Sequence, residues 1–475
     1  MVGSRSKSLI LRCAVLFLAF FMTAGCSAEK GQNPQGTGET QSQSTVAAPG
    51  KTAITFSYHG GEMGEVLENS VLEFNKEEKA PVSVRILKIP SDRYDETLNM
   101  LFTSGQGPDV FELESDWIDS YITKEWLFNL KKYCDKEFLD RFPSWVAGYA
   151  DSLHTESGLF TLPSSLTTVR LVYNRDLFKA AGLDPDLPPL TLEELESDAR
   201  TISNNEKGNM KYGFAINAGD GRDCFKQFLE SVYTMEGVFY YDFKEGKYNL
   251  DVYRKWFQAL VRMKEEEILY PGEMILKGDM ALKQFAMGNI GMMYVNSAAP
   301  GSLEKLASQL QRKCDWAVAM PPAMDGKAQG KGKISILPGG FYCVNKAGSD
   351  PEGSVALWKY LYSATHLKDM FEKGYALPIM DNILATNTPA LEKLKAFLPC
   401  GNDEVYPVPP RIINSWVRFD AYNEALKNSS GIAQALEEET GNLNIMFNSI
   451  VDSGTVDSNM YKNPEFDWQH PMKTR

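Results

Sequence analysis

Apolar residues recur with two different spacings between residues 54 and 111, and the two spacings alternate. Short apolar runs are typical of buried strands, whereas apolar residues three and four positions apart mark one face of a helix. The segments follow in the order strand, helix, strand, helix, strand: Ile54 to Tyr58, Met63 to Glu77, Val82 to Ile89, Asp92 to Thr103 and Val110 to Phe111. This alternation predicts a parallel sheet covered by helices, an α/β fold.

The stretch from Gly158 to Leu195 is the most informative part of the chain. Leu159 to Leu162 is an apolar run stopped by Pro163, so we expect a strand there that crosses between two parts of the molecule. A short turn rich in Ser and Thr follows. The next apolar run, Val169 to Tyr173, predicts a second strand.

Two helices are predicted in the second half of this stretch. Asn174 leads into a short helix that Gly182 ends. Thr191 is followed three residues later by Glu194, which is the spacing of a capping box, in which each side chain bonds to the backbone N–H of the other residue. The capping box predicts a helix over 192–203.

The rest of the chain continues the same alternation. Helices are expected over 117–133, 225–233, 251–267, 280–288, 352–363 and 421–442. Strands are expected over 211–215, 290–295, 316–320 and 334–338. The polar tail after Asp452 is expected to be poorly ordered, as chain ends without apolar contacts are.

Length and charge narrow the class of protein. A chain of 475 residues is too long for one ordinary core, so two domains or two interleaved lobes are expected. The formal net charge is -13, and removal of the first 25 residues, which hold three basic and no acidic side chains, makes it -16. Such a surface argues against nucleic acid or anionic lipid as the main partner.

The N-terminus has the features of a secreted, lipid-anchored protein. Residues 1–25 form a leader with a basic start and a short apolar core, too short for an ordinary membrane-spanning helix. The small residues Ala24 and Gly25 precede Cys26, as in a bacterial lipobox, although Thr23 stands where Leu is usual. We therefore expect acylation of Cys26, with residues 26–50 as a flexible tether to the outer face of the cell membrane.

Enzyme and metal signals are weak. Five cysteines remain beyond Cys26, widely spaced and without a CxxC pair, which favours small buried side chains over a zinc site or a disulfide framework, with one disulfide left open. The four histidines show no metal-ligand spacing, and no HExxH or GxSxG motif is present. We expect no enzymatic activity, no cofactor and no metal.

Several motifs together resemble a known family. The string SGQGPDV ends at Val110, a YGF strand lies at 212–214, and a short helix, a glycine and an apolar strand follow one another over 280–295. With the central stretch from Gly158 to Leu195, these motifs, in this order, resemble the family 1 extracellular solute-binding proteins, the sugar-binding receptors of bacterial ABC importers. The resemblance covers about Ala53 to Asn442.

The resemblance implies an α/β fold of two interleaved lobes, a periplasmic-binding-protein-like clamp of type II. Lobe I would comprise 51–165 plus 336–395, and lobe II 166–335 plus 396–475. The chain would cross between the lobes three times, first inside the central stretch and second near Ile334 to Gly340.

The resemblance also implies a function. A carbohydrate, expected to be an oligosaccharide, would bind between the lobes of a monomer and shift the population toward a closed form, which delivers it to an ABC permease. Three alternatives stay open: the same fold binding a polyamine, peptide or metal; a sensor subunit; and a secreted glycoside hydrolase.

Candidate ligand residues are polar or aromatic side chains at strand ends and turns, because sugar hydroxyls need planar polar partners and sugar C–H faces pack on rings. They are Tyr58, His59, Glu62, Asp109, Glu114, Trp117, Ser164, Thr168, Asp220, Asn296, Gly339, Gly340, Phe341, Arg411 and Trp416. The two glycines are expected to let backbone N–H groups approach the ligand. Ala298 and Ala299 stand where many family members place a Trp, so one stacking platform is expected to be missing.

Overall fold

The computed structural model describes residues 50–472 except 61–63, 91–92, 147, 150–157, 206–209, 312, 327–330, 375, 385–391, 393, 411–416 and 455. Three four-stranded sheets organise these residues. None of the helices among them is both long and apolar enough to cross a bilayer.

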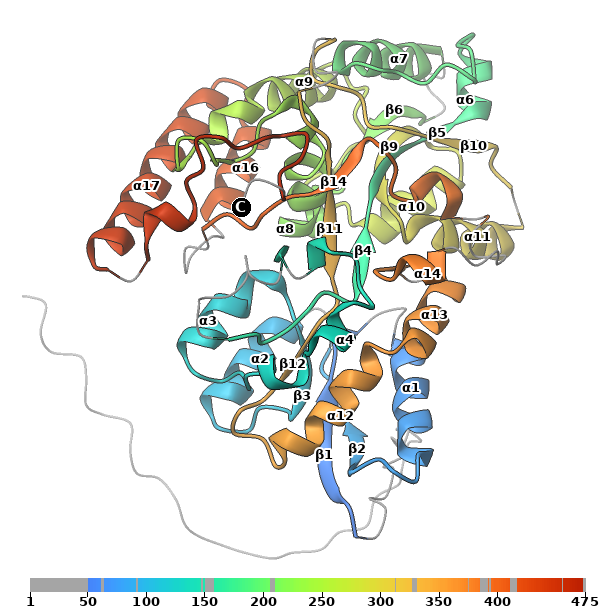
Figure 1. The fold of residues 1–475 in the computed structure, drawn as a ribbon. Helices are drawn as coiled ribbons and strands as arrows, with labels where there is room; N and C mark the ends of the chain where they lie inside the picture. The colour runs from blue at the N-terminus through green and yellow to red at the C-terminus, as the bar shows by residue number, and fades with distance from the viewer. Residues whose placement is uncertain are drawn as a thin grey trace, which may run out of the picture. The chain divides into compact units, whose positions relative to one another are not determined.

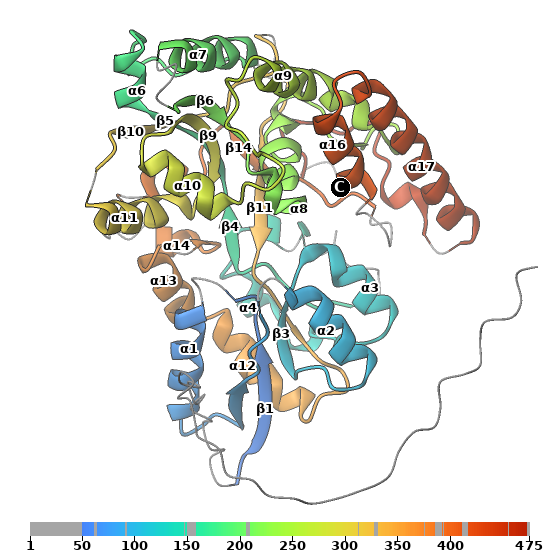
Figure 2. The same cartoon turned by 180° about the vertical axis from the view of Figure 1, so that it is seen from behind.

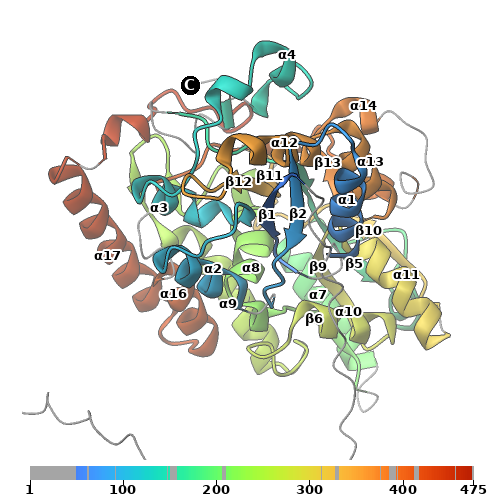
Figure 3. The same ribbon diagram turned by 90° about the horizontal axis from the view of Figure 1, so that it is seen from below.

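The first sheet confirms the predicted βαβαβ pattern. Its order is β12-β3-β1-β2, with β1 parallel to both β2 and β3, and β12 antiparallel to β3. Figure 3 shows α2 and α3 on one side of this sheet and α1 and α13 on the other. The elements are β1 (Thr52–Ser57), α1 (Gly64–Lys76), β2 (Val82–Ile86), α2 (Tyr94–Thr103), β3 (Val110–Leu113), α3 (Ile118–Thr123), α4 (Lys136–Leu139), β12 (Phe341–Val344), α12 (Pro351–Leu361), α13 (Ala364–Glu372) and α14 (Asp381–Leu384).

The second sheet has the order β10-β5-β9-β6, in which only β6 and β9 are parallel. Figures 1 and 2 show α7 beyond one face of this sheet and α10 and α11 beyond the other. The elements are β5 (Val169–Asn174), α6 (Arg175–Ala180), α7 (Leu192–Asn205), β6 (Tyr212–Ala215), α8 (Arg222–Phe225) with a π-helical continuation (Lys226–Glu230), β7 (Tyr241–Asp242), β8 (Lys247–Tyr248), α9 (Arg254–Glu265), α10 (Gly278–Ala286), β9 (Ile290–Asn296), α11 (Ala299–Leu310) and β10 (Trp316–Ala319).

Two main hydrophobic cores correspond to the two lobes. The first core surrounds the first sheet and buries Trp358 completely. The second core lies under α7, α9 and the C-terminal helices and buries Trp256, while a smaller cluster fills the other face of the second sheet. Four of the five described cysteines are buried and all five are free thiols, as expected of small apolar side chains.

A third sheet joins the lobes. Its order is β13-β4-β11-β14, built from β4 (Ser165–Thr167), β11 (Ile334–Gly339), β13 (Leu377–Pro378) and β14 (Asp403–Val405). β4 and β11 pair antiparallel, and both run from residues of one core to residues of the other. These strands are the first and second predicted crossings, and β14 lies on the third.

The crossing strand expected at Leu159 to Leu162 is wrong in position. That segment has no strand partners, and Thr161 donates its hydroxyl to the carbonyl of Tyr342 instead, at 2.8 Å. The strand is Ser165–Thr167, where a turn was expected. Pairing with β11 on one side and β13 on the other makes it a strand, and no local pattern could show those distant partners.

A buried ion pair fixes the third crossing. Arg170, at the start of β5, donates two hydrogen bonds to the carboxylate of Asp403, at 2.9 and 2.7 Å, and both side chains are almost fully buried. The same guanidinium donates to the carbonyls of Ala396 and Leu398. The exposed Cys400 lies in this segment, and its N–H donates to Asp403.

The C-terminal region differs from the expectation in two ways. The single helix expected over 421–442 is two helices, α16 (Val417–Lys427) and α17 (Ile432–Asp452), which pack on each other. The described part of the tail packs on the protein: Phe466 is buried in the second core, and Tyr406 donates its hydroxyl to the carbonyl of Trp468 at 2.7 Å. The aromatic residues of the tail therefore hold it against the second core, although its average composition is polar.

Candidate functional site

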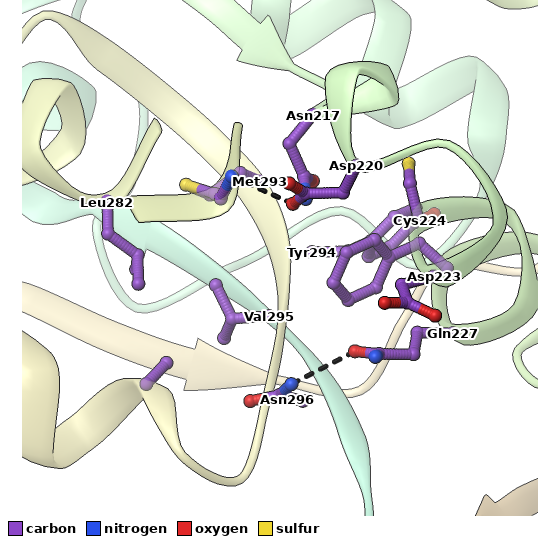
Figure 4. Close-up of a pocket in the computed structure, with 13 residues that line it drawn as sticks. Asn217, Asp220, Asp223, Cys224, Gln227, Leu282, Met293, Tyr294, Val295 and Asn296 are labelled. Carbon is purple, nitrogen blue, oxygen red and sulfur yellow. Dashed lines mark hydrogen bonds between the residues drawn. The ribbon is translucent and has the colours of Figure 1, made fainter. Parts of the chain in front are cut away.

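A pocket of about 320 Å³ opens in lobe II, and we call it the lobe II pocket. Its polar lining consists of two carboxylates and three amides, from Asp220, Asp223, Asn217, Gln227 and Asn296 (Figure 4). The remaining lining residues are Cys224, Phe228, Gly278, Leu282, Met293, Tyr294, Val295 and Ala299. Several hydroxyl groups of a ligand could find planar acceptors and donors here.

Strand ends and one short helix position these side chains. Asn217 and Asp220 follow β6, and Asn296 ends β9, which is parallel to β6, so both strands end at the same edge. Asn217 donates an amide hydrogen to Asp220 at 2.7 Å, and the N–H of Gly278 donates to the same carboxylate at 2.8 Å. Asn296 donates to the side-chain oxygen of Gln227 at 2.9 Å. The pocket is therefore held in a fixed geometry.

Lobe I supplies an acidic wall, which consists of Asp95 in α2, Glu112 in β3, and Glu114 and Asp116 just after β3, with His59 beside it beyond the end of β1. The N–H of His59 donates to the Glu112 carboxylate at 2.9 Å, and the His59 ring lies 5.3 Å from the ring of Tyr94. Burial, with smaller contributions from the neighbouring Glu114 and Asp95, raises the pKa of Glu112 to about 7, although the hydrogen bond from the His59 N–H opposes this shift. The carboxyl groups of this wall are close enough to disfavour one another's charge.

Two basic residues of lobe II face this wall. The Arg222 guanidinium lies 3.9 Å from a carboxylate oxygen of Asp95, 3.9 Å from one of Glu114 and 3.7 Å from one of Asp116. The Lys226 ammonium donates to the Ser115 hydroxyl at 3.1 Å. These contacts bring the two lobes together at the residues after β3.

A second, smaller cavity of about 90 Å³ lies next to these contacts, between residues of both lobes and the crossing strands. In its wall, Arg418 donates to the Glu230 carboxylate at 2.8 Å, and Tyr422 donates to the same group at 3.2 Å. Arg418 also lies over the ring of Tyr240, 4.3 Å from its centre. Burial raises the pKa of Glu230, and the hydrogen bonds from Arg418 and Tyr422 oppose this shift.

Comparison with known proteins identifies the family of the chain. The family model for bacterial extracellular solute-binding proteins matches residues 70–398, more than half of the chain. This chain belongs to that family. Membership confirms the resemblance inferred from the sequence.

Curated relatives of this solute-binding protein include the sn-glycerol-3-phosphate-binding periplasmic protein UgpB of Escherichia coli K12. It is 25% identical over 313 residues, which cover 63% of this chain and 67% of UgpB. UgpB of Salmonella typhimurium LT2 is 26% identical over 318 residues, with the same coverage.

Solved structures share the two-lobed fold. A solute-binding protein of an ABC transporter from Thermotoga lettingae, bound with alpha-D-tagatose, has a TM-score of 0.68 at 19% identity and covers 83% of this chain and 100% of its own. The GacH receptor of Streptomyces glaucescens, studied with acarbose, has a TM-score of 0.67 at 20% identity and covers 85% and 99%.

Within this solute-binding fold, four of the candidate ligand residues, Asp220, Asn296, Glu114 and His59, lie beside a cavity or on the acidic wall. Asp220 and Asn296 line the lobe II pocket. Glu114 lies opposite Arg222, and Trp117, three residues on, packs partly buried against the first core. His59 joins this wall through Glu112. Ligand contact by these residues stays a prediction.

Other candidates have structural partners that account for them. Tyr58 is buried and its hydroxyl donates to Glu68 at 3.0 Å, while Thr168 is fully buried and donates to the carbonyl of Phe397. Asp109 lies at the other end of β3, where Thr55 donates twice to its carboxylate. Phe341, in the first core, stacks on Tyr149. The placement of these side chains does not support ligand contact.

Gly339 and Gly340 lie where two crossings meet, and their contact with ligand stays a prediction. Gly340 has a positive φ of 64°, and a Cβ there would lie 2.1 Å from the hydroxyl oxygen of Ser164. A Cβ on Gly339 would lie 3.4 Å from the Ser165 hydroxyl. Ser164 is itself buried, and its N–H donates to the carbonyl of Gly339 at 2.9 Å. The glycines let two crossings approach each other.

Glu62, Arg411, Trp416 and the expected lipid site Cys26 lie outside the described residues. Sequence reasoning missed Asp223 and Gln227 in the lobe II pocket, and Lys226 and Glu230 on the opposite side of the same segment. One signal could have found them: this segment directly follows the YGF strand, whose end points to the ligand edge of the sheet.

Proposed function

We propose that this chain captures a carbohydrate between its lobes and delivers it to an ABC import permease. The observation that carries the proposal is the lobe II pocket, in which amide and carboxylate groups converge around a partly apolar floor that includes Phe228 and Tyr294. Such a lining suits a ligand with many hydroxyl groups. Structural neighbours with alpha-D-tagatose, acarbose and stachyose support it.

A phosphate ester is the second candidate, because the UgpB relatives bind sn-glycerol 3-phosphate. The pocket lining contains Asp220 and Asp223 but no Lys or Arg among the described residues. Two basic residues that adjoin Asp223 and Gln227 in the chain, Arg222 and Lys226, contact lobe I. A phosphate dianion in this pocket would meet like charge, so the pocket favours a neutral carbohydrate.

Capture would proceed by hinge closure. The ligand would bind in the lobe II pocket and would contact the acidic wall of lobe I only when the lobes close. Binding therefore shifts the population toward the closed form. The closed form is the one that would dock on the permease. No covalent step is needed, so we propose a monomeric, non-enzymatic binding protein with boundaries near 51–165 plus 336–395 for lobe I and 166–335 plus 396–475 for lobe II.

Thermal unfolding in the presence of a ligand panel tests this proposal. The panel would contain mono-, di- and oligosaccharides, sn-glycerol 3-phosphate and a polyamine. At a ligand concentration of 100 times Kd, stabilisation of about 2.7 kcal/mol is expected, which raises Tm by several degrees. A shift with glycerol phosphate or the polyamine, and with no saccharide, would overturn the carbohydrate assignment.

Asn296→Ala tests the pocket itself. This substitution removes the amide held by Gln227 and is expected to weaken saccharide binding by roughly tenfold, as loss of one or two hydrogen bonds does. Asn205→Ala is the matched control, because Asn205 is an exposed residue at the end of α7, away from the pocket. Equal affinity of both variants would place the ligand elsewhere.

We also propose that the protein is anchored to the outer face of the cell membrane by lipid on Cys26. Labelled palmitate should enter the wild-type protein in bacterial cells, whereas Cys26→Ser should remain unlabelled and be released from the membrane fraction. Thr23→Leu would match the usual lipobox and should be processed at least as fast. Membrane retention of Cys26→Ser would contradict the anchor.

A further inference from the structure

One short helical segment has a role in both halves of the site. In α8 and its π-helical continuation, Asp223 and Gln227 line the lobe II pocket. Arg222 and Lys226 each lie one position earlier and face the carboxylates of lobe I. The segment therefore touches the pocket with one side and the opposite lobe with the other.

The contacts of Arg222 are spread over several carboxylates. Its nitrogen atoms lie 3.4 to 3.9 Å from oxygens of Asp95, Glu114, Asp116 and Asp223, of which the first three belong to lobe I. None of these four contacts is a tight bidentate pair. The attraction is therefore mainly electrostatic and spread over two oppositely charged surfaces. Added salt screens an attraction of this kind.

Partial burial makes this attraction stronger than an ordinary surface pair. The Arg222 side chain is 10% exposed, and the Asp95 and Asp116 side chains are 19% and 20% exposed. Lys226 adds a direct hydrogen bond to Ser115 and lies 3.5 Å from Asp116. Opening the lobes would separate these charges and leave the acidic wall without its cations.

We propose that Arg222 and Lys226 form an interlobe latch that populates the closed form before ligand arrives and so raises ligand affinity without touching the ligand. The apparent Kd is the intrinsic Kd divided by the fraction of molecules in the binding-competent form. A latch that changes this fraction changes the apparent Kd for every ligand of the pocket by the same factor. The inference rests on the two-lobed fold and holds whatever the solute is.

The first test needs no ligand. Dyes at Met100 in lobe I and Leu187 in lobe II, both exposed, report the interlobe distance by single-molecule energy transfer on the purified chain. Arg222→Gln and Lys226→Gln are each expected to lower the closed fraction by roughly 3- to 10-fold, the size of effect expected for one partly buried charged contact. Raising NaCl to about 1 M, where the Debye length is about 3 Å, should open the wild-type protein in the same way.

Two controls separate the latch from a general loss of charge or stability. Arg200→Gln removes an arginine that pairs with Glu266 inside lobe II and should leave the distance distribution unchanged. Lys226→Glu should open the protein, because the new carboxylate faces that of Asp116, whereas Lys226→Arg keeps the charge and should leave the wild-type distribution. Circular dichroism of each variant checks that it is folded.

The outcomes are decisive in both directions. The latch is supported if Arg222→Gln and Lys226→Gln shift the distance distribution, Lys226→Arg does not, and salt removes the difference. It is overturned if folded variants show the wild-type distribution at low salt. Affinity for a saccharide found in the thermal panel gives a second readout: an unchanged Kd in opened variants would refute the proposed link, whereas a failed panel would concern only the carbohydrate assignment.

Discussion

At the scale of single residues, buried polar groups decide where the fold is sensitive. His366, at the start of α13, is 2% exposed, and its Nδ1 lies 2.7 Å from the hydroxyl of Ser70 in α1. Its Nε2 has no hydrogen-bond partner among the described residues. Burial lowers the pKa of His366 to about 4, with Asp369 opposing and Lys373 reinforcing the shift. The folded state therefore favours neutral histidine.

We predict an acid-sensitive first lobe as a result. The unfolded chain takes up the proton near pH 6.5 and the folded chain only near pH 4, so stability is complete above pH 6.5 and falls as the pH decreases toward 4. The loss from this group approaches about 3 kcal/mol. Urea unfolding at pH 7.5 and 4.5 should show it, and His366→Leu should lose less than the wild type between these pH values.

Gly340 gives a prediction about backbone conformation. Gly340→Ala places a Cβ against the Ser164 hydroxyl at a positive φ, so it should destabilise the protein by about 3 kcal/mol or more, from strain and overpacking together. Gly374→Ala is the matched control, because Gly374 also has a positive φ of 77° but has open space around it. Its effect should be about 1 kcal/mol. Equal losses of unfolding free energy would show that the contact with Ser164 is unimportant.

At the scale of elements, the joining sheet depends on Arg170 and Asp403. Arg170→Met leaves a buried carboxylate without its partner and should destabilise the protein by roughly 3 to 5 kcal/mol. Arg170→Met combined with Asp403→Leu removes both charges and should recover most of that loss. Denaturant unfolding measures both, and a double variant as unstable as the single one would contradict the argument.

The same elements show how far the sequence alone leads. The βαβαβ pattern and the capping box at Thr191 and Glu194 are local signals, and the structure confirms both. β4 was missed because its pairing partners lie more than 150 residues away. The ordered tail was missed because Phe466 and Trp468 pack on Phe243, a contact that average polarity does not reveal.

For the site, sequence reasoning succeeded where strand ends were visible. Asp220 and Asn296 were found from the ends of two apolar strands. Gln227 was missed because it lies inside a helical stretch. Which side of that helix borders the pocket depends on the packing of neighbouring elements, which the sequence alone does not show. The interlobe contacts of Arg222 were likewise out of reach, because they join segments about one hundred residues apart.

At the scale of the whole molecule, closure should protect two separate surfaces at once. Addition of a saccharide from the panel should slow hydrogen exchange in residues 112–117 of lobe I and in residues 217–227 of lobe II, relative to the protein without saccharide. Both segments should slow because a ligand of the closed form covers both. A peptide from α12, behind the first sheet, should exchange unchanged and serves as the reference. Slowing in lobe II alone would mean that the ligand binds without closure.

The third crossing carries a chemical handle. Cys400 is exposed, whereas the other four cysteines of the described region are buried, and Cys400 lies three residues before the Asp403 that Arg170 holds. Within the described part of the chain, a thiol-reactive fluorophore should therefore attach at one position, on a segment that connects the lobes. Domain movement would change the surroundings of the dye, and the protein could then be developed into an optical sensor for its own solute.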